Sequence, residues 1–250
     1  AITKTTNNHD AIRSAVGEHP NFNLITLDNI PKEEKFANVV FCAPPSGSED
    51  YPGDVKKAAD NLWAGPDEGR FVFTSSGGIY GPGNGEVINE SSPLPESTMA
   101  SPRSLRLVNA EKNVLAKKGS VLRLAGLYTL ERGAHNYWLD KGDGSVKGSK
   151  GGIINLLHYD DAAGACVAAL KTDNDIGGSV FLISDGHPTT RFGICESALK
   201  SKRYNDGAMP SFGEDDGSEK GKIYDGKISN ESLKWEPRYE SFDKFMESSQ

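Results

Sequence analysis

The sequence predicts an α/β protein whose core is a parallel β-sheet. Short apolar runs without polar alternation recur along the chain, as in strands that are covered on both faces. Stretches with the apolar spacing of one buried helix face lie between these runs. Strands that alternate with helices are typical of a parallel sheet, and this order decides the fold class.

The expected strands are runs of Val, Ile, Leu and Phe that end in Gly, Pro, Ser or His. They cover residues 38–45, 70–76, 120–126, 153–158 and 179–184. The strongest is the first, because Pro44 and Pro45 stop it sharply. Residues 2–6 are expected to be the end of a further strand.

The expected helices cover residues 54–62, 104–118, 160–170 and 192–202. Asp160 and Asp161 favour a helix N-terminus, because carboxylates cap it and match its dipole. Two segments rich in Gly, Asp and Lys, 139–152 and 205–226, are expected to be loops. The second is expected to hold a short strand at residues 223–224.

Charge and cysteine content exclude several classes of function. The chain has 28 Lys and Arg residues and 35 Asp and Glu residues, and its net charge of −7 argues against a nucleic-acid partner. No apolar run is long enough for a membrane span. The wide spacing of Cys42, Cys166 and Cys195 predicts neither a disulfide framework nor a metal site, and it favours an intracellular reducing compartment.

Three expected strand ends carry small or hydroxyl residues, at positions 42–44, 74–81 and 125–128. In an open parallel sheet, ligands bind at the carboxyl ends of the strands. Small residues let a flat ligand approach the backbone, and hydroxyls offer hydrogen-bond donors. Each segment alone is equally well explained as a turn, but the three together favour a binding site.

The segment 74–81, Thr-Ser-Ser-Gly-Gly-Ile-Tyr-Gly, resembles the SSxxxYG segment of the extended short-chain dehydrogenases/reductases, the NAD-dependent epimerase/dehydratase family. Four further segments resemble motifs of that family in the right order: 121–128, 154–162, 181–186 and 235–237. The resemblance is greatest to atypical members, the bacterial YeeZ-like proteins and their plant or algal relatives.

This resemblance implies a Rossmann-type doubly wound parallel sheet with a small C-terminal cap. The NAD(P)-binding domain would comprise residues 1–128 and 153–186, and the cap residues 129–152 and 187–250. The residues that match cofactor-binding positions are Lys4, Ala43, Pro44, Thr74, Ser75, Ala125 and Gly126. Lys4 matches a position where a basic residue meets the 2′-phosphate of NADP. The alternative is a solvated lysine at a strand end.

The catalytic positions match only in part. Ser76 matches the family's Ser/Thr, which polarises a substrate oxygen. The family's YxxxK pair, which supplies the acid–base group, falls here on Arg103 and Leu107, and neither can do that chemistry. Tyr80 and Tyr128 are candidate substitutes, although tyrosines in such places more often pack with a bonded hydroxyl.

The family's Gly-rich opening, GxxGxxG, has no counterpart in this sequence. We therefore expect that one βα unit is missing upstream of Ala1, and that a transit peptide before it would place the protein in a plastid rather than the cytoplasm. Arg132 and His135, near the expected substrate pocket, are candidates for binding an anionic substrate. The alternative is that they are ordinary polar residues on the surface.

Two functions remain. One is an NAD- or NADP-binding oxidoreductase or epimerase that acts on a small polar substrate. The other is a catalytically lapsed relative that serves as a structural or regulatory subunit of a larger protein assembly. The retained Ser76 favours the enzyme, and the absent YxxxK pair favours the subunit.

Overall fold

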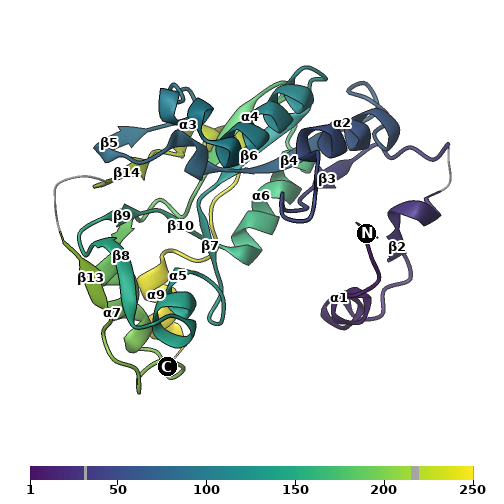
Figure 1. Cartoon of the computed structure of the whole chain (residues 1–250). Coiled ribbons are helices and arrows are strands. Elements are labelled where there is room, and N and C mark those ends of the chain that lie inside the picture. Colours follow the sequence, from purple (N-terminus) through teal and green to yellow (C-terminus); the bar gives the residue numbers. More distant parts are fainter. Residues whose placement is uncertain (31–32, 215–219, 250) are drawn as a thin grey trace. The chain divides into compact units, whose positions relative to one another are not determined.

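The computed structural model describes residues 1–30, 33–214 and 220–249, and the chain forms two compact units, residues 1–36 and 37–250. In the first unit (Figure 1), β1 (Ile2–Thr3) pairs in parallel with β2 (Ile25–Thr26). Helix α1 (His9–Val16) connects the two strands, and the single turn η1 (Leu27–Asn29) follows them. The expected strand at residues 2–6 is thus confirmed only in its first half.

The second unit is built on a four-stranded parallel sheet in the order β11-β6-β4-β3 (Figure 1). Its strands are β3 (Val39–Phe41), β4 (Phe71–Ser76), β6 (Ser120–Leu124) and β11 (Val180–Ile183). All four coincide with expected strands. The apolar runs predicted them well because both faces of this sheet are covered by helices.

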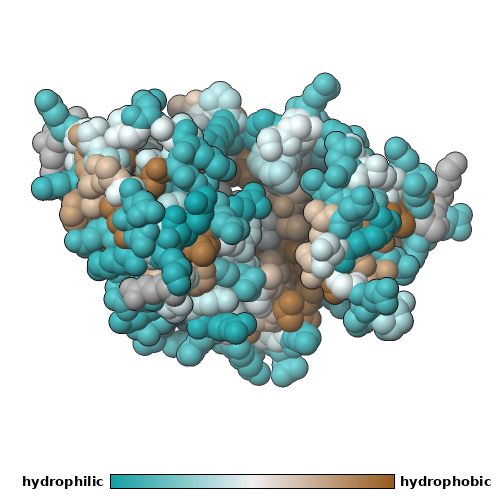
Figure 2. All heavy atoms as spheres, turned by 90° about the horizontal axis from the view of Figure 1, so that it is seen from below, coloured by the Kyte–Doolittle hydropathy of each residue, from teal (hydrophilic) through white to brown (hydrophobic). Residues whose placement is uncertain are grey.

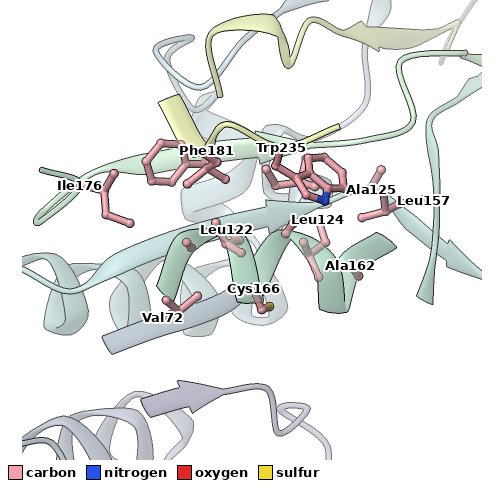
Figure 3. Close-up of a cluster of buried hydrophobic side chains, with 14 residues drawn as sticks. Val72, Leu122, Leu124, Ala125, Leu157, Ala162, Cys166, Ile176, Phe181 and Trp235 are labelled. Atoms are coloured by element: carbon pink, nitrogen blue, oxygen red, sulfur yellow. The ribbon is translucent and has the colours of Figure 1, made fainter. Parts of the chain in front are cut away.

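Alternate residues of these strands enter two different cores. Val72 and Leu122 lie in the first core with α6 (Tyr159–Lys171), α8 (Lys227–Leu233) and Trp235, as Figure 3 shows in part. Phe73 and Val121 lie in the second core with α2 (Tyr51–Asn61) and α4 (Pro102–Leu115). Since successive side chains of a strand point to opposite faces, helices cover both faces of the sheet. The expected doubly wound α/β architecture is confirmed.

Further pairs of short strands lie outside this four-stranded sheet. Parallel pairs join β7 (Gly126–Tyr128) to β10 (Leu156–His158), β5 (Asn84–Ile88) to β14 (Gly221–Tyr224), and β8 (Ser145–Ser149) to β13 (Ser211–Gly213). An antiparallel pair joins β9 (Ile153–Ile154) to β12 (Thr189–Thr190).

The remaining elements are short. They are η2 (Gly77–Tyr80), α3 (Glu96–Ala100), α5 (Ala134–Asn136), the π-helical turn η3 (Tyr137–Lys141), α7 (Arg191–Leu199) and α9 (Phe242–Ser248). A third core joins α7, α9 and β10 around Tyr128. The division into Rossmann and cap segments stays a prediction, although α8 lies on a sheet face rather than in this third core.

The two expected loops need correction. Residues 139–152 contain the end of η3 and strand β8, which has a single buried apolar residue, Val146, and so gives little apolar signal. Residues 205–226 contain β13 and β14, and the short strand expected at residues 223–224 is confirmed. The part of that expected loop at 215–219 lies outside the described residues.

Hydrophilic side chains dominate the face of the molecule shown in Figure 2, in keeping with the charged fraction of 25%. In the described part of the chain, no helix combines the length and the apolar character that a membrane crossing needs.

Candidate functional site

A pocket of about 580 Å³ lies at the carboxyl ends of β4 and β6. Its floor is formed by Ser76 and by Leu124, Ala125 and Gly126, where β6 leads into β7. The N-terminal end of α4, the β9 segment, Arg191 of α7 and strand β14 line its walls. This is the edge where a parallel sheet binds its ligands.

Ser76 is the last residue of β4, and it lines the pocket. Its hydroxyl oxygen accepts a hydrogen bond from the Gly78 N–H at 3.1 Å, which leaves the hydroxyl proton for another acceptor. The preceding Ser75 donates its hydroxyl proton to Glu111 Oε1 at 2.6 Å, and Thr74 donates to the Phe41 carbonyl at 3.4 Å. Only Ser76 of these three hydroxyl residues reaches the pocket.

A buried polar network braces β4 against β6 and α4. Arg123 Nη2 lies 2.7 Å from Glu111 Oε2, and Arg123 Nη1 donates to the Tyr80 hydroxyl at 2.7 Å. The Tyr80 hydroxyl donates in turn to the Asn89 carbonyl at 3.0 Å. Burial raises the pKa of Tyr80. Tyr80 does not line the pocket, and its hydroxyl is occupied by this network.

Tyr128 is fully buried in the third core, where its ring lies 5.0 Å from that of Phe242 and 5.3 Å from that of His158. Its hydroxyl has no hydrogen-bond partner among the described residues, and burial raises its pKa. Like Tyr80, it does not line the pocket. The structure gives neither tyrosine a contact with a ligand space, and their catalytic roles stay predictions.

Arg132 and His135 also lie away from the pocket lining. The Arg132 guanidinium lies 5.2 Å from the centroid of the Tyr159 ring. His135 is buried with its Nε2 3.0 Å from the Leu130 carbonyl oxygen, and burial lowers its pKa. A neutral, buried imidazole is a poor partner for an anion.

The residues expected to hold a cofactor divide into two groups. Ala125 and Gly126 line the pocket, and Ala43 and Pro44 are exposed at the end of β3, beside the same sheet edge. The Ala43 carbonyl accepts a hydrogen bond from the Tyr51 hydroxyl at 2.8 Å, which fixes that strand end. Lys4 belongs to the first unit and is exposed after β1.

Sequence reasoning assigned no role to several residues that line the pocket. Asn155 ties β14 in place, since its Nδ2 donates to the Lys222 carbonyl at 2.8 Å and its Oδ1 accepts from the Tyr224 N–H at 2.9 Å. Arg191 donates to the Ser149 carbonyl at 3.3 Å. Asn155 belongs to a segment that resembles a family motif. Lys222 and Tyr224 belong to an expected loop in which the sequence predicted a short strand at residues 223–224 but no binding role.

Neither of the two residues at the expected acid–base positions lines the pocket. Arg103 is exposed, and Leu107 packs beside the core between α2 and α4. Ser101 and Ser104, near the start of α4, line the pocket instead. Within the described residues, no cluster of His, Cys, Asp and Glu could hold a metal ion.

Solved structures match the fold of this chain over nearly its whole length. The chain has a Rossmann-like α/β fold. UDP-glucuronic acid 4-epimerase from Bacillus cereus, in complex with NAD, matches at a TM-score of 0.73 and 16% identity, over 100% of this chain and 86% of that one. dTDP-glucose 4,6-dehydratase from Bacillus anthracis, also in complex with NAD, matches at a TM-score of 0.68 and 17% identity, over 94% and 80%.

A functionally unknown conserved protein from Silicibacter pomeroyi matches at a TM-score of 0.71 and 20% identity, over 100% of this chain and 88% of that one. No family model matches the sequence, and comparison with curated protein sequences gives no significant relative. At such identities the likeness establishes the fold alone.

Proposed function

We propose that this protein is an NAD(P)-binding oxidoreductase or epimerase of the short-chain dehydrogenase/reductase type, acting on a small polar substrate. The observation that carries the proposal is the pocket at the carboxyl ends of β4 and β6, with the Ser76 hydroxyl at its floor. Two similar folds, the epimerase and the dehydratase, hold NAD. In this role Ser76 donates a hydrogen bond to the substrate oxygen at which charge changes during the reaction.

Some of the residues at this sheet edge are suited to bind a flat dinucleotide. Ala43 and Pro44 are small and exposed, and Ala125 and Gly126 offer backbone without bulky side chains. The cofactor, when bound, would accept or supply a hydride. Its pyrophosphate needs a Gly-rich turn at a helix N-terminus, and the sequence offers none with that spacing.

We propose that a Gly-rich βα unit of the same protein supplies this turn and pairs with β3. Two observations support it. Within the described residues β3 is the last strand of its sheet, and the Val40 side chain on it is 37% exposed, unlike the buried residues of β4 and β6. An apolar strand at an open edge is a template for another strand. Protein that carries such a unit should bind NAD more tightly than residues 1–250 alone.

Thermal unfolding of the protein that carries this Gly-rich unit, with NAD and with NADP, tests the proposal directly. A ligand at a hundredfold excess over its Kd stabilises the folded state by about 2.7 kcal/mol, and the preferred cofactor should raise Tm accordingly. Where cofactor binds, Ser76→Ala should remove turnover in a panel of nucleotide sugars and leave the Tm shift in place. Ser92→Ala, outside the pocket lining, is the matched control. The absence of any shift with either cofactor would contradict the proposal.

A second candidate function is that of a catalytically inactive relative that serves as a structural or regulatory subunit of a larger assembly. Arg103 and Leu107 at the acid–base positions favour it. Native mass spectrometry of the protein from its source tissue separates the two, because a subunit co-purifies with partners in fixed ratio. Fractionation of the same tissue tests the further proposal that the protein resides in a plastid or the cytoplasm, where the described free thiols would stay reduced.

A further inference from the structure

The described residues that line the pocket carry a charge opposite to that of the chain. The chain has a net charge of −7, yet no Asp or Glu is among the described residues that line the pocket. Two cations, Arg191 and Lys222, do line it. Low-dielectric walls of one sign of charge concentrate ligands of the opposite sign.

Lys222 is the more unusual of the two cations, because it is only 6% exposed. Its ammonium donates to the Tyr80 carbonyl. Among the described residues no carboxylate lies within ion-pair distance of it. The carboxylate of Glu86 on β5 attracts it from farther away, and the cost of burial outweighs that attraction and lowers the pKa of Lys222. A buried ammonium without a paired carboxylate is costly to fold, which points to a role that needs the charge.

Tyr224 offers a second donor in the same pocket, two residues along β14. Its ring lies against the backbone of Gly77, the residue after Ser76: a Cβ placed on Gly77 would lie 2.7 Å from the Tyr224 hydroxyl oxygen. The Tyr224 ring can therefore occupy this position only because Gly77 has no side chain. Among the described residues, the Tyr224 hydroxyl has no hydrogen-bond partner.

We propose that Lys222 and Tyr224 together bind an anionic oxygen group, a carboxylate or a phosphate monoester, of the small molecule that occupies this pocket. The inference rests on the proposed function, since it names the substrate class of the same site. An ammonium and a neutral hydroxyl can both donate to one anion, and such charge-assisted bonds are the strong ones. In this proposal Lys222 and Tyr224 have the anion-binding role that the sequence analysis predicted for Arg132 and His135.

Asn155 supports the proposal because it holds both donors in position. Its amide bonds to the Lys222 carbonyl and to the Tyr224 N–H fix the backbone on either side of Ile223. The pair is therefore set before a ligand arrives. A prepositioned pair loses less conformational entropy when it binds.

The test is calorimetric titration of the full chain with four probes: inorganic phosphate, glucose 1-phosphate, glucuronate and glucose. At least one anionic probe should bind more tightly than glucose, and the phosphate and carboxylate arms show which anion is preferred. Lys222→Met should weaken that binding about tenfold or more, and Tyr224→Phe several-fold. Lys220→Met is the matched control, because Lys220 is exposed and two residues away.

Thermal unfolding without ligand gives an independent readout. Lys222→Met removes a buried charge and should therefore raise Tm. If Lys222 instead served to stabilise the fold through its bond to the Tyr80 carbonyl, the same substitution would lower Tm. The inference is overturned if no anionic probe binds better than glucose, or if Lys222→Met and Lys220→Met bind alike. NAD and NADP titrations of the protein that carries the proposed Gly-rich unit separate the two ideas. Cofactor binding without anion binding refutes only the inference, and anion binding without cofactor binding refutes only the proposed function.

Discussion

Asp185 is a buried carboxyl whose ionisation should destabilise the protein at neutral pH. The residue follows β11 and is 4% exposed. Its Oδ1 accepts a hydrogen bond from the His187 N–H at 2.9 Å, but its Oδ2 is buried without a partner among the described residues. Burial, with a smaller contribution from nearby Asp161, raises the pKa of Asp185 to about 7.

The size and sign of the effect follow from proton linkage. The pKa of an Asp in an unfolded chain is about 3.9. The folded and unfolded states therefore differ by about 4 kcal/mol in their free energy of proton binding at this residue. Between these two pKa values the folded protein binds more protons than the unfolded chain, and the free energy of unfolding therefore falls as pH rises. The penalty is absent below about pH 4 and complete above about pH 7.

Asp185→Asn should remove this penalty, because its amide keeps an acceptor for His187 and never ionises. Urea unfolding of both proteins at a series of pH values measures it. The variant should gain up to about 4 kcal/mol over wild type as pH rises from about 4 to about 7, and the difference should then stay constant. Asp67→Asn, at an exposed site, is the control. A difference that does not change with pH would refute the reasoning.

Three further substitutions test other parts of the structure. Glu111→Gln leaves the buried Arg123 without its countercharge and should cost about 3 kcal/mol in urea unfolding, and a loss below about 1 kcal/mol would contradict the pairing. Gly77→Ala places a methyl group 2.6 Å from the Tyr224 ring and should destabilise by about 1–3 kcal/mol with loss of anion binding, and unchanged binding would contradict that packing. Tyr128→Phe removes a buried, unpartnered hydroxyl and should leave the melting temperature unchanged or raised, whereas a clear drop would reveal a partner for that hydroxyl.

The sheet could be predicted from the sequence because its signal is local. Strands β3 and β11 are continuous apolar runs, β4 begins with one, and Arg123 interrupts the run of β6. Residues such as Val72 and Phe73 are buried on opposite faces of the sheet, so both had to be apolar. The segment 74–81 followed from the same logic, because residues at the end of such a strand lie at the binding edge. The choice of Ser76 within that segment came from the family resemblance. These inferences needed no knowledge of distant contacts.

The walls of the pocket could not be predicted in this way. Strand β14 has the sequence Gly-Lys-Ile-Tyr, and most of the residues of its partner β5 are exposed, so neither has a distinctive pattern. Their pairing depends on residues far apart in the chain. Arg132 and His135 lie outside the lining of this pocket, and their role as anion ligands stays a prediction. For His135 the reason is related, because local polarity does not show which side chains a core will bury, and His135 is 1% exposed.

The pairing of β5 with β14 also sets the order in which the site can form. Lys222 and the carbonyl that it contacts, on Tyr80, are 142 positions apart in the sequence. Contacts of such long range close large loops and form late in folding, after local helices and neighbouring strands. During synthesis, a chain that has already made its central sheet would still lack the cationic wall of the pocket. Ligand binding would therefore require the synthesis of β14, and deletion of Gly221–Tyr224 should abolish it.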